Sequence, residues 1–170
     1  ELYTGWLARL DAMDFEALGL EDRIDWILFR GELQQRQGDL EFERQRVNEA
    51  APLLPEVAAL IELAEARRAL QQAEGRSSAG RLERARAALA DLDARIEAKD
   101  AALSTLSPAV AHRAARVLDA THRALKDWHA HQDGYDPDFT HWVSNPWQAL
   151  DAQLPKTAEL IRKRLAGVDN

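Results

Sequence analysis

The sequence contains no cysteine among its 170 residues. This absence excludes disulfide bonds, thiolate metal sites, cysteine nucleophiles and iron–sulfur clusters. Valine and isoleucine together number only 11, so the residues that favour β-strands are scarce. No apolar run approaches the roughly 18 residues of a membrane-spanning helix. We therefore expect no membrane span. The 22 basic residues are interspersed with 29 acids and form no polybasic run, so we also expect no nucleic-acid partner.

The chain is instead rich in alanine and leucine. Alanine supplies 31 residues and leucine 24, and both are strong helix formers. The apolar fraction of 46% and the length suit one domain of ordinary size with a continuous core. We therefore predict an all-α fold, an up-and-down bundle of five to six helices, in a single domain over residues 1–170. The chain opens at Glu1 without a signal peptide, and we expect it to be part of a larger protein.

Two helices are predicted before residue 51. The first covers about residues 2–13, and the second follows Gly19 as its N-cap and runs to about Ala50. Gly31 and Gly38 each cost a helix about 1 kcal/mol relative to alanine, which suggests a bend or a close helix contact there. The residues predicted to face inward from these two helices are Leu2, Trp6, Leu7, Leu10, Ile24, Trp26, Ile27 and Leu28.

The middle of the chain predicts two more helices. Pro55 fits the first position of a helix, whose expected inner face is Val57, Leu60, Ile61, Ala64 and Leu70. Residues 74–80, with two glycines and two serines, predict a turn between antiparallel helices, and a domain linker is the alternative. The next helix has the clearest heptad in the chain, broken at Lys99, which favours a bundle helix over an extended coiled coil. The heptad consists of Leu82, Leu89, Ile96 and Leu103, with Ala85, Leu92 and Leu106 at the companion positions.

The last third predicts two helices separated by an aromatic segment. Ser107 and Pro108 start the first of these helices, and Asp133 and Gly134 end it. Asn145 and Pro146 are predicted to start the last helix, which Pro155 should kink or interrupt and Gly167 should end. The expected inner face of the first is Val110, Ala114, Val117, Thr121, Leu125 and Trp128.

Two aspartate–histidine pairs at helical spacing offer a possible metal site. In Asp119/His122 and in Asp138/His141 both side chains of the pair would lie on one helix face, as the glutamate–histidine pairs of di-iron bundles do. The alternative, which we favour, is a solvated helix face with occasional ion pairs. Asp133, Asp136 and Asp138 likewise suggest a calcium loop, but their spacing differs from that of an EF-hand and fits a turn between helices better.

Five aromatic residues gather within about twenty positions and form the most specific local feature. They are Trp128, Tyr135, Phe139, Trp142 and Trp147. Such a cluster is typical either of a ligand pocket or of a hydrophobic corner where helices meet, and the corner is the commoner case. No Gly-x-Ser-x-Gly elbow, phosphate-binding glycine loop or His-Glu-x-x-His motif is present. We therefore predict no catalytic, cofactor-binding or metal residue in this segment.

At this aromatic segment the chain resembles a bacterial family known as domain of unknown function 885 (DUF885). The matching positions are Gly134, Tyr135, Asp136, Pro137, Phe139, Thr140, Trp142 and Pro146, while His141 and Trp147 depart from the family pattern. Residues 20–26, residues 54–57 and the end of the last helix are similar as well, so the resemblance extends over almost the whole chain.

The resemblance implies an all-helical zinc metallopeptidase-like protein whose zinc-binding motif lies far downstream of this region. The chain would then be a non-catalytic N-terminal part that forms one wall of the substrate cleft. Its implied partners are the C-terminal domain of the same protein and a peptide substrate, and the implied location is periplasmic, secreted or lipid-anchored. Tyr135, Asp136 and Trp142 are the expected contacts to the substrate or to the other domain. The alternative is a freestanding helical interaction module whose aromatic corner or leucine heptad binds a partner.

Overall fold

The computed structural model describes residues 2–68 and 74–167. In these two ranges the chain forms seven α-helices and no strand, so the all-α prediction is confirmed. The chain divides into two compact units, Glu1–Asn48 and Glu49–Asn170. The single domain over residues 1–170 stays a prediction. None of the helices in the described ranges has the length and apolar character that a membrane crossing requires.

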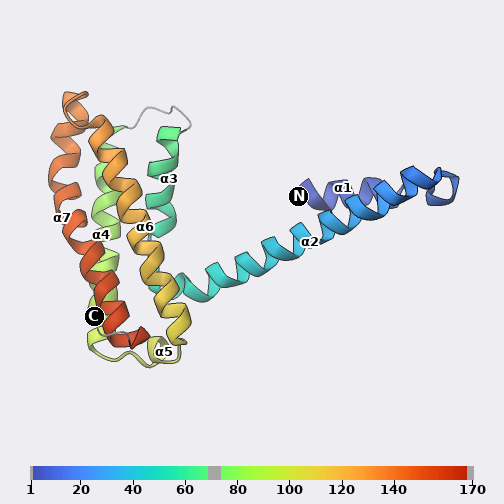
Figure 1. Ribbon diagram of the computed structural model, residues 1–170. Helices are drawn as coiled ribbons and strands as arrows, with labels where there is room; N and C mark the ends of the chain where they lie inside the picture. Colours follow the sequence, from blue (N-terminus) through green and yellow to red (C-terminus); the bar gives the residue numbers. More distant parts are fainter. Residues whose placement is uncertain (1, 69–73, 168–170) are drawn as a thin grey trace. The chain divides into compact units, whose positions relative to one another are not determined.

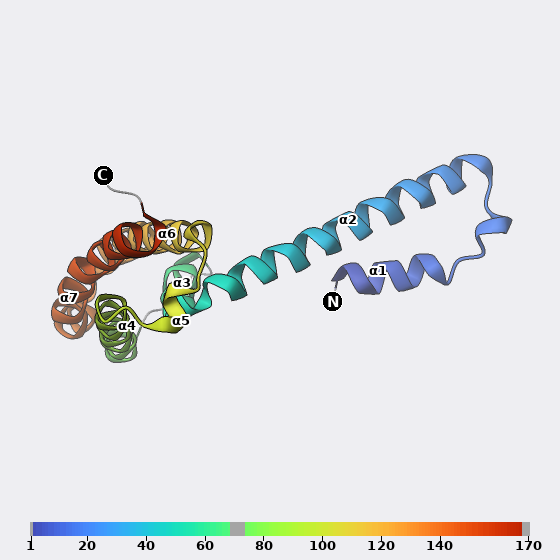
Figure 2. The same cartoon turned by 90° about the horizontal axis from the view of Figure 1, so that it is seen from below.

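The first unit is a helical hairpin. α1 (Leu2–Asp11) is followed by a 3-10 turn (Phe15–Ala17) and by α2 (Leu20–Ala50). The turn reverses the chain, so that α1 lies along the N-terminal half of α2 (Figures 1 and 2). The Gly19 carbonyl accepts the Arg23 N–H at 2.9 Å, so α2 begins where the sequence predicts. The Trp26 indole N–H donates to the Leu10 carbonyl at 3.0 Å. An ion pair between Arg30 of α2 and Asp11 of α1, 3.1 Å apart, also joins the two helices.

The predicted inner face of α2 is wrong. Ile24, Ile27 and Leu28 are 49%, 55% and 65% exposed. The side of α2 that lies against α1 carries Trp26, which is half-buried, and Leu33, which is buried. Since both sides of this helix carry apolar residues, sequence periodicity could not show which one α1 covers.

The expected stripe of α1 is buried only at its C-terminal end. Leu10 is buried and Leu7 half-buried, but Leu2 and Trp6 are exposed. Of the two alternatives expected at Gly31 and Gly38, a bend or a close helix contact, the contact is wrong, because a Cβ at either position would meet no atom of the described residues within 4 Å.

The second unit is a bundle of four long helices. α3 (Val57–Arg68), α4 (Gly75–Glu97), α6 (Pro108–Gln132) and α7 (Pro137–Ile161) run alternately up and down (Figure 1). α7 packs against both α4 and α6, and α3 packs against α4 and α6. The short helix α5 (Ala101–Ser104), the 3-10 turn Ala51–Leu53 and the π-helical turn Arg162–Ala166 complete the unit. Its largest fully buried side chains are Leu53, Leu60, Leu82, Leu89, Leu92, Leu103, Leu118, Leu125, Trp128, Phe139, Leu150 and Leu154.

The predicted heptad is the inner face of α4, but the helix ends before the pattern does. Leu82, Leu89 and Ile96 are buried, as are the companions Ala85 and Leu92, whereas Leu106 is half-buried. α4 ends at Glu97, and Lys99 then takes a left-handed conformation with φ 55°.

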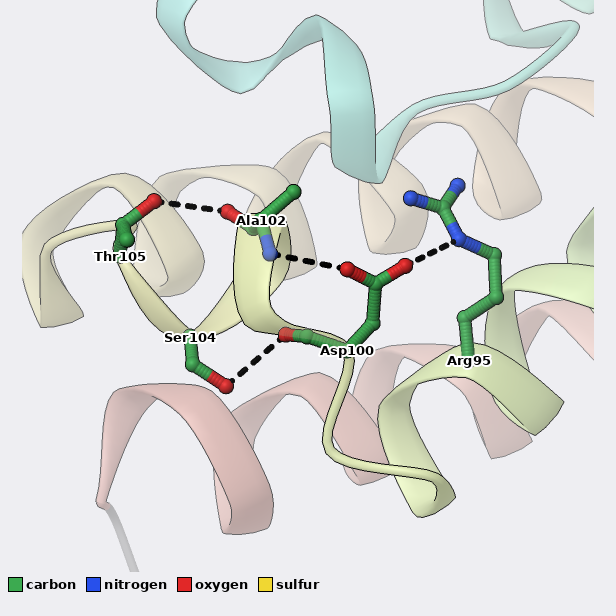
Figure 3. Close-up of polar contacts among 5 residues, drawn as sticks. All are labelled: Arg95, Asp100, Ala102, Ser104 and Thr105. Carbon is green, nitrogen blue, oxygen red and sulfur yellow. Dashed lines mark hydrogen bonds and ion pairs between the residues drawn. The ribbon is translucent and has the colours of Figure 1, made fainter.

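Asp100 starts α5 by a cap that the heptad pattern could not reveal. Its carboxylate accepts the Ala102 N–H at 2.8 Å and pairs with Arg95 at 2.9 Å (Figure 3). The hydroxyl groups of Ser104 and Thr105 donate to backbone carbonyls of the same turn (Figure 3). The last heptad leucine, Leu103, is therefore buried from a separate helix.

Residues 74–80 are not the predicted loop but the start of α4. The Glu74 carboxylate accepts the Ser77 N–H at 2.8 Å and caps the helix. Gly75 lies against α7, where a Cβ would come within 3.0 Å of the Phe139 Cα. Ser78 and Ala79 are buried. The small residues therefore permit close packing of two helices, which sequence reasoning mistook for flexibility.

α3 begins two residues later than predicted. Glu56 has φ 59°, outside the helical region, so Pro55 lies in the turn before the helix. Val57 and Leu60 are buried as expected, and Leu63 joins them. Ile61 is exposed, Ala64 is half-buried, and Leu70 lies outside the described residues.

α6 follows the prediction closely, while α7 begins earlier than expected. Ser107 caps α6, and all its predicted inner residues are buried except Val117, which is half-buried. α7 is capped by Asp136, so Pro146 lies inside the helix and does not start it. Pro155 also lies inside and does not interrupt the helix. Gly167, with φ 66°, ends the following π-helical turn as predicted.

Candidate functional site

The turn from α6 to α7 is built by polar residues of the motif that carries the family resemblance. Gly134 has φ 78°, a left-handed conformation that glycine adopts without strain. The Thr140 hydroxyl accepts the Gly134 N–H at 2.9 Å and donates to Asp133 at 3.1 Å. The Asp136 carboxylate accepts the N–H groups of Asp138 and Phe139, at 2.9 Å and 3.4 Å. These bonds reverse the chain and start α7.

The aromatic corner, defined as Trp128, Tyr135, Phe139, Trp142 and Trp147, divides into buried and exposed members. Trp128 and Phe139 are fully buried and meet edge to face at 5.2 Å between ring centroids. Trp147 is half-buried and stacks on His129 at 4.9 Å. Tyr135 is 90% exposed and Trp142 is 38% exposed. The corner is therefore hydrophobic core on its inner side and an aromatic surface on its outer side.

The exposed indole of Trp142 is held in place by charged neighbours. Its N–H donates to the Asp138 carboxylate at 3.2 Å, four residues earlier on α7. The Arg76 guanidinium, from the first turn of α4, lies 5.1 Å from the Trp142 ring centroid. Sequence reasoning missed Arg76, because it placed residues 74–80 in a loop.

The three predicted contact residues therefore have different surroundings. Tyr135 and Trp142 are on the surface, and the Tyr135 hydroxyl forms no hydrogen bond within the described residues. Asp136 is half-buried, and its Oδ1 caps α7. The two aromatic side chains are the exposed members of the three.

The residues of the two predicted aspartate–histidine pairs contact residues outside their own pair. Asp119 pairs with Arg162 of the π-helical turn, and His122 Nε2 lies 2.6 Å from Asp151 of α7, so the two residues join α6 to α7 and to the turn that follows it. Asp138 accepts from Trp142, and His141 is exposed. Among the described residues no group of three or more histidine, aspartate or glutamate side chains could hold a metal ion. In the suggested calcium loop, the Asp133 and Asp136 carboxylates accept hydrogen bonds of the turn, and the Asp138 carboxylate accepts from the Trp142 indole within α7.

The structure places a buried carboxylate between α4 and α7 that no sequence pattern indicates. Asp93 is 5% exposed, and its Oδ2 accepts from Gln153 Nε2 at 2.8 Å and pairs with Lys156 at 3.3 Å. Its Oδ1 has no hydrogen-bond partner among the described residues. Asp93 follows the heptad residue Leu92 and reads in sequence as an exposed position, so only the parallel packing of α4 on α7 reveals it.

His129, which stacks on Trp147 of the corner, has a perturbed protonation equilibrium. Burial lowers its pKa from the ordinary 6.5, and the negative charges of Asp133 and Asp151 oppose this effect in part. Its Nε2 is buried and has no hydrogen-bond partner among the described residues. The folded chain therefore favours the neutral imidazole on Trp147.

We expect this histidine to make folding less favourable in acid. Below about pH 6.5 the unfolded chain takes up a proton at His129 that the folded chain resists, so the free energy of unfolding falls as the pH is lowered further. His129→Phe keeps a ring on Trp147 and removes this contribution. Urea unfolding between pH 7.5 and 5 should show a smaller loss of stability for the variant than for the wild type. Parallel curves for the two proteins would contradict the assignment.

Comparison with known proteins leaves the chain without a match: no family model fits it, and no curated protein or solved structure is significantly similar to it.

Proposed function

We propose that the chain is a non-catalytic helical domain of a protein resembling the bacterial zinc metallopeptidases of the DUF885 type. Its aromatic corner would contribute to one wall of the substrate cleft. Zinc would be supplied by a motif on another part of the protein, and the partners would be that part and a peptide substrate. The family resemblance at residues 134–146 suggests this function.

The observation that carries the proposal is the exposure of Tyr135 on a turn whose neighbouring residues form hydrogen bonds or lie in the core. Gly134 supplies the left-handed backbone of the turn, and the Asp136 and Thr140 side chains form its hydrogen bonds, so each of the three has a structural role. Phe139 has one in the core. Tyr135 has none, since its ring is 90% exposed. Aromatic side chains that combine an apolar ring with a polar tip are typical of contact surfaces.

The proposal is tested first on the coding sequence downstream of Asn170. A His-Glu-x-x-His-type helix in the same reading frame supports a metallopeptidase-like parent, and an uninterrupted reading frame without it argues against one. In that parent, Tyr135→Ala and Trp142→Ala should raise KM for peptides about tenfold with little change in kcat, because a cleft wall binds substrate without reacting with it. Gln148→Ala, at an exposed position of α7, is the matched control and should leave KM unchanged.

The purified chain alone should cleave no peptide. Chelator-sensitive, zinc-dependent hydrolysis by the 170-residue chain would overturn the assignment of a non-catalytic role. If the parent is active and both aromatic variants have an unchanged KM, the corner does not line the substrate cleft, although the parent is still a peptidase.

A freestanding interaction module is the second candidate. The heptad cannot be its binding surface, because Leu82, Leu89 and Ile96 are buried within the second unit. The aromatic corner remains available for such a role. The observation that favours this candidate lies in the first unit, where apolar side chains of α2 are exposed.

A further inference from the structure

The side of α2 that faces away from α1 carries an apolar strip, which we call the α2 seam. Its members share one face of the helix, since each lies three, four or seven residues from another member. They are Leu20, Ile24, Ile27, Leu28, Gly31, Gly38 and Phe42. All five large side chains are exposed, Leu20 and Leu28 by 77% and 65%. Exposed apolar residues that gather on one face mark an interaction surface.

The seam suits a helix as its occupant. α2 is an unbroken helix from Leu20 to Ala50, so its backbone groups are engaged in helical hydrogen bonds and offer no edge for an added strand. Gly31 and Gly38 lie seven residues apart within the seam, and a Cβ at either would meet nothing within 4 Å. These gaps allow the backbone of a second helix to come close. From Ile24 to Phe42 the seam spans about 27 Å, the length of a helix of about five turns.

One border of the seam is acidic. Asp25, Glu32 and Asp39 are exposed and follow one another at spacing seven beside the apolar residues. Asp25 and Asp39 take part in no ion pair among the described residues, and Glu32 pairs only with Arg36 of its own helix at 2.8 Å. A solvent-exposed pair of this kind offsets little of the charge.

The opposite border does not compensate for these acids. Arg23 and Arg30 lie there, but Arg23 pairs with Glu16 and Arg30 pairs with Asp11, both of the same unit. Residues 1–48 contain eleven acids and six arginines, a net charge of −5 within a chain whose total is −7. The first unit therefore carries most of the negative charge of the protein.

We propose that the α2 seam docks a basic amphipathic helix of another protein. The apolar stripe of that helix would cover Ile24, Ile27 and Leu28, and its lysine or arginine side chains would lie along Asp25, Glu32 and Asp39. A second copy of this chain is disfavoured as the occupant, because it would bring an equal negative charge against the seam. The proposal is independent of the role of the aromatic corner, which lies in the other unit.

The test measures binding of two designed peptides to the full chain by fluorescence anisotropy. Both are 21-residue helices, roughly the length of the seam, with one leucine–alanine stripe; their borders carry lysine in one peptide and glutamate in the other. We expect the lysine peptide to bind at least tenfold more tightly, with an affinity that falls as salt is added. Ile24→Ser together with Leu28→Ser should weaken its binding at least tenfold. Circular dichroism should stay unchanged, since both side chains are exposed.

Reversal of the acidic charges beside the seam is the second and more selective part of the test. Asp25→Lys, Glu32→Lys and Asp39→Lys combined should reverse the preference, so that the glutamate peptide binds more tightly. The matched control makes the same change in net charge on α3 and α4, by Glu65→Lys, Glu83→Lys and Asp91→Lys, and should keep the preference for the lysine peptide. The proposal is overturned if neither peptide binds, if both bind equally, or if sedimentation shows a dimer that depends on the seam.

Discussion

Replacement of Phe139 by alanine is expected to lower the free energy of unfolding by about 3–5 kcal/mol, the range for a phenylalanine removed from a packed core. The ring is fully buried and meets Trp128 at 5.2 Å. The backbone of Phe139 also lies against Gly75 of α4, so the cavity would open where three helices meet. Urea unfolding followed by circular dichroism measures the loss.

Trp142→Ala is the matched control for this prediction. Trp142 lies three residues further along α7, but its ring is exposed and contacts Arg76 and Asp138 at the surface. Exposed cation–π contacts contribute about 0.5–1 kcal/mol, so its removal should cost far less than that of Phe139. Equal losses for the two variants would contradict the division of the corner into a buried and an exposed side.

Replacement of Gly75 by valine is expected to cost about 2 kcal/mol, since side chains forced into a packed contact strain both neighbours. A Cβ at this position would lie 3.0 Å from the Phe139 Cα and 3.1 Å from the Asp138 carbonyl oxygen. Both are backbone atoms, so no side chain can rotate away to relieve the contact. Thermal unfolding of the variant should show a lowered midpoint.

Gly80→Ala provides the comparison within the same helix. Its Cβ would meet only the Arg84 guanidinium at 3.6 Å, an ordinary contact with the end of a flexible side chain. Alanine is favoured over glycine inside a helix by about 1 kcal/mol, so this variant should be more stable than the wild type. If residues 74–80 were a flexible turn, the two substitutions would have similar and small effects, which would contradict the structure.

These glycines show why the fold class could be predicted while parts of the chain could not. The heptad of α4 and the alternation of caps and apolar faces in α6 depend on residues close in sequence, so Leu82, Leu89 and Trp128 were assigned correctly. Gly75 has its role only because Phe139, sixty-four residues away, lies beside it. Its composition resembles that of a turn, and no local rule separates the two cases.

The same limit applies to the candidate site. The sequence predicts contact roles for Tyr135 and Trp142, and both side chains are exposed. It could not identify Arg76, His129 or Asp93, whose surroundings come from other helices. It also assigned the wrong side of α2 to the interior, since both sides of that helix carry large apolar residues and α1 covers only one.

The two prolines inside α7 are expected to divide this helix into segments that differ in their resistance to local opening. Pro146 and Pro155 have no N–H, so the regular helical pattern offers no donor to the carbonyls of Trp142 and Asp151. Amide hydrogens next to these two levels should exchange with solvent sooner than those of the uninterrupted helix α6. The first level is at Trp142, where an exposed indole and a carbonyl without its usual helical donor belong to one residue. We therefore expect the turn of α7 that presents the aromatic surface to open locally without unfolding of the bundle.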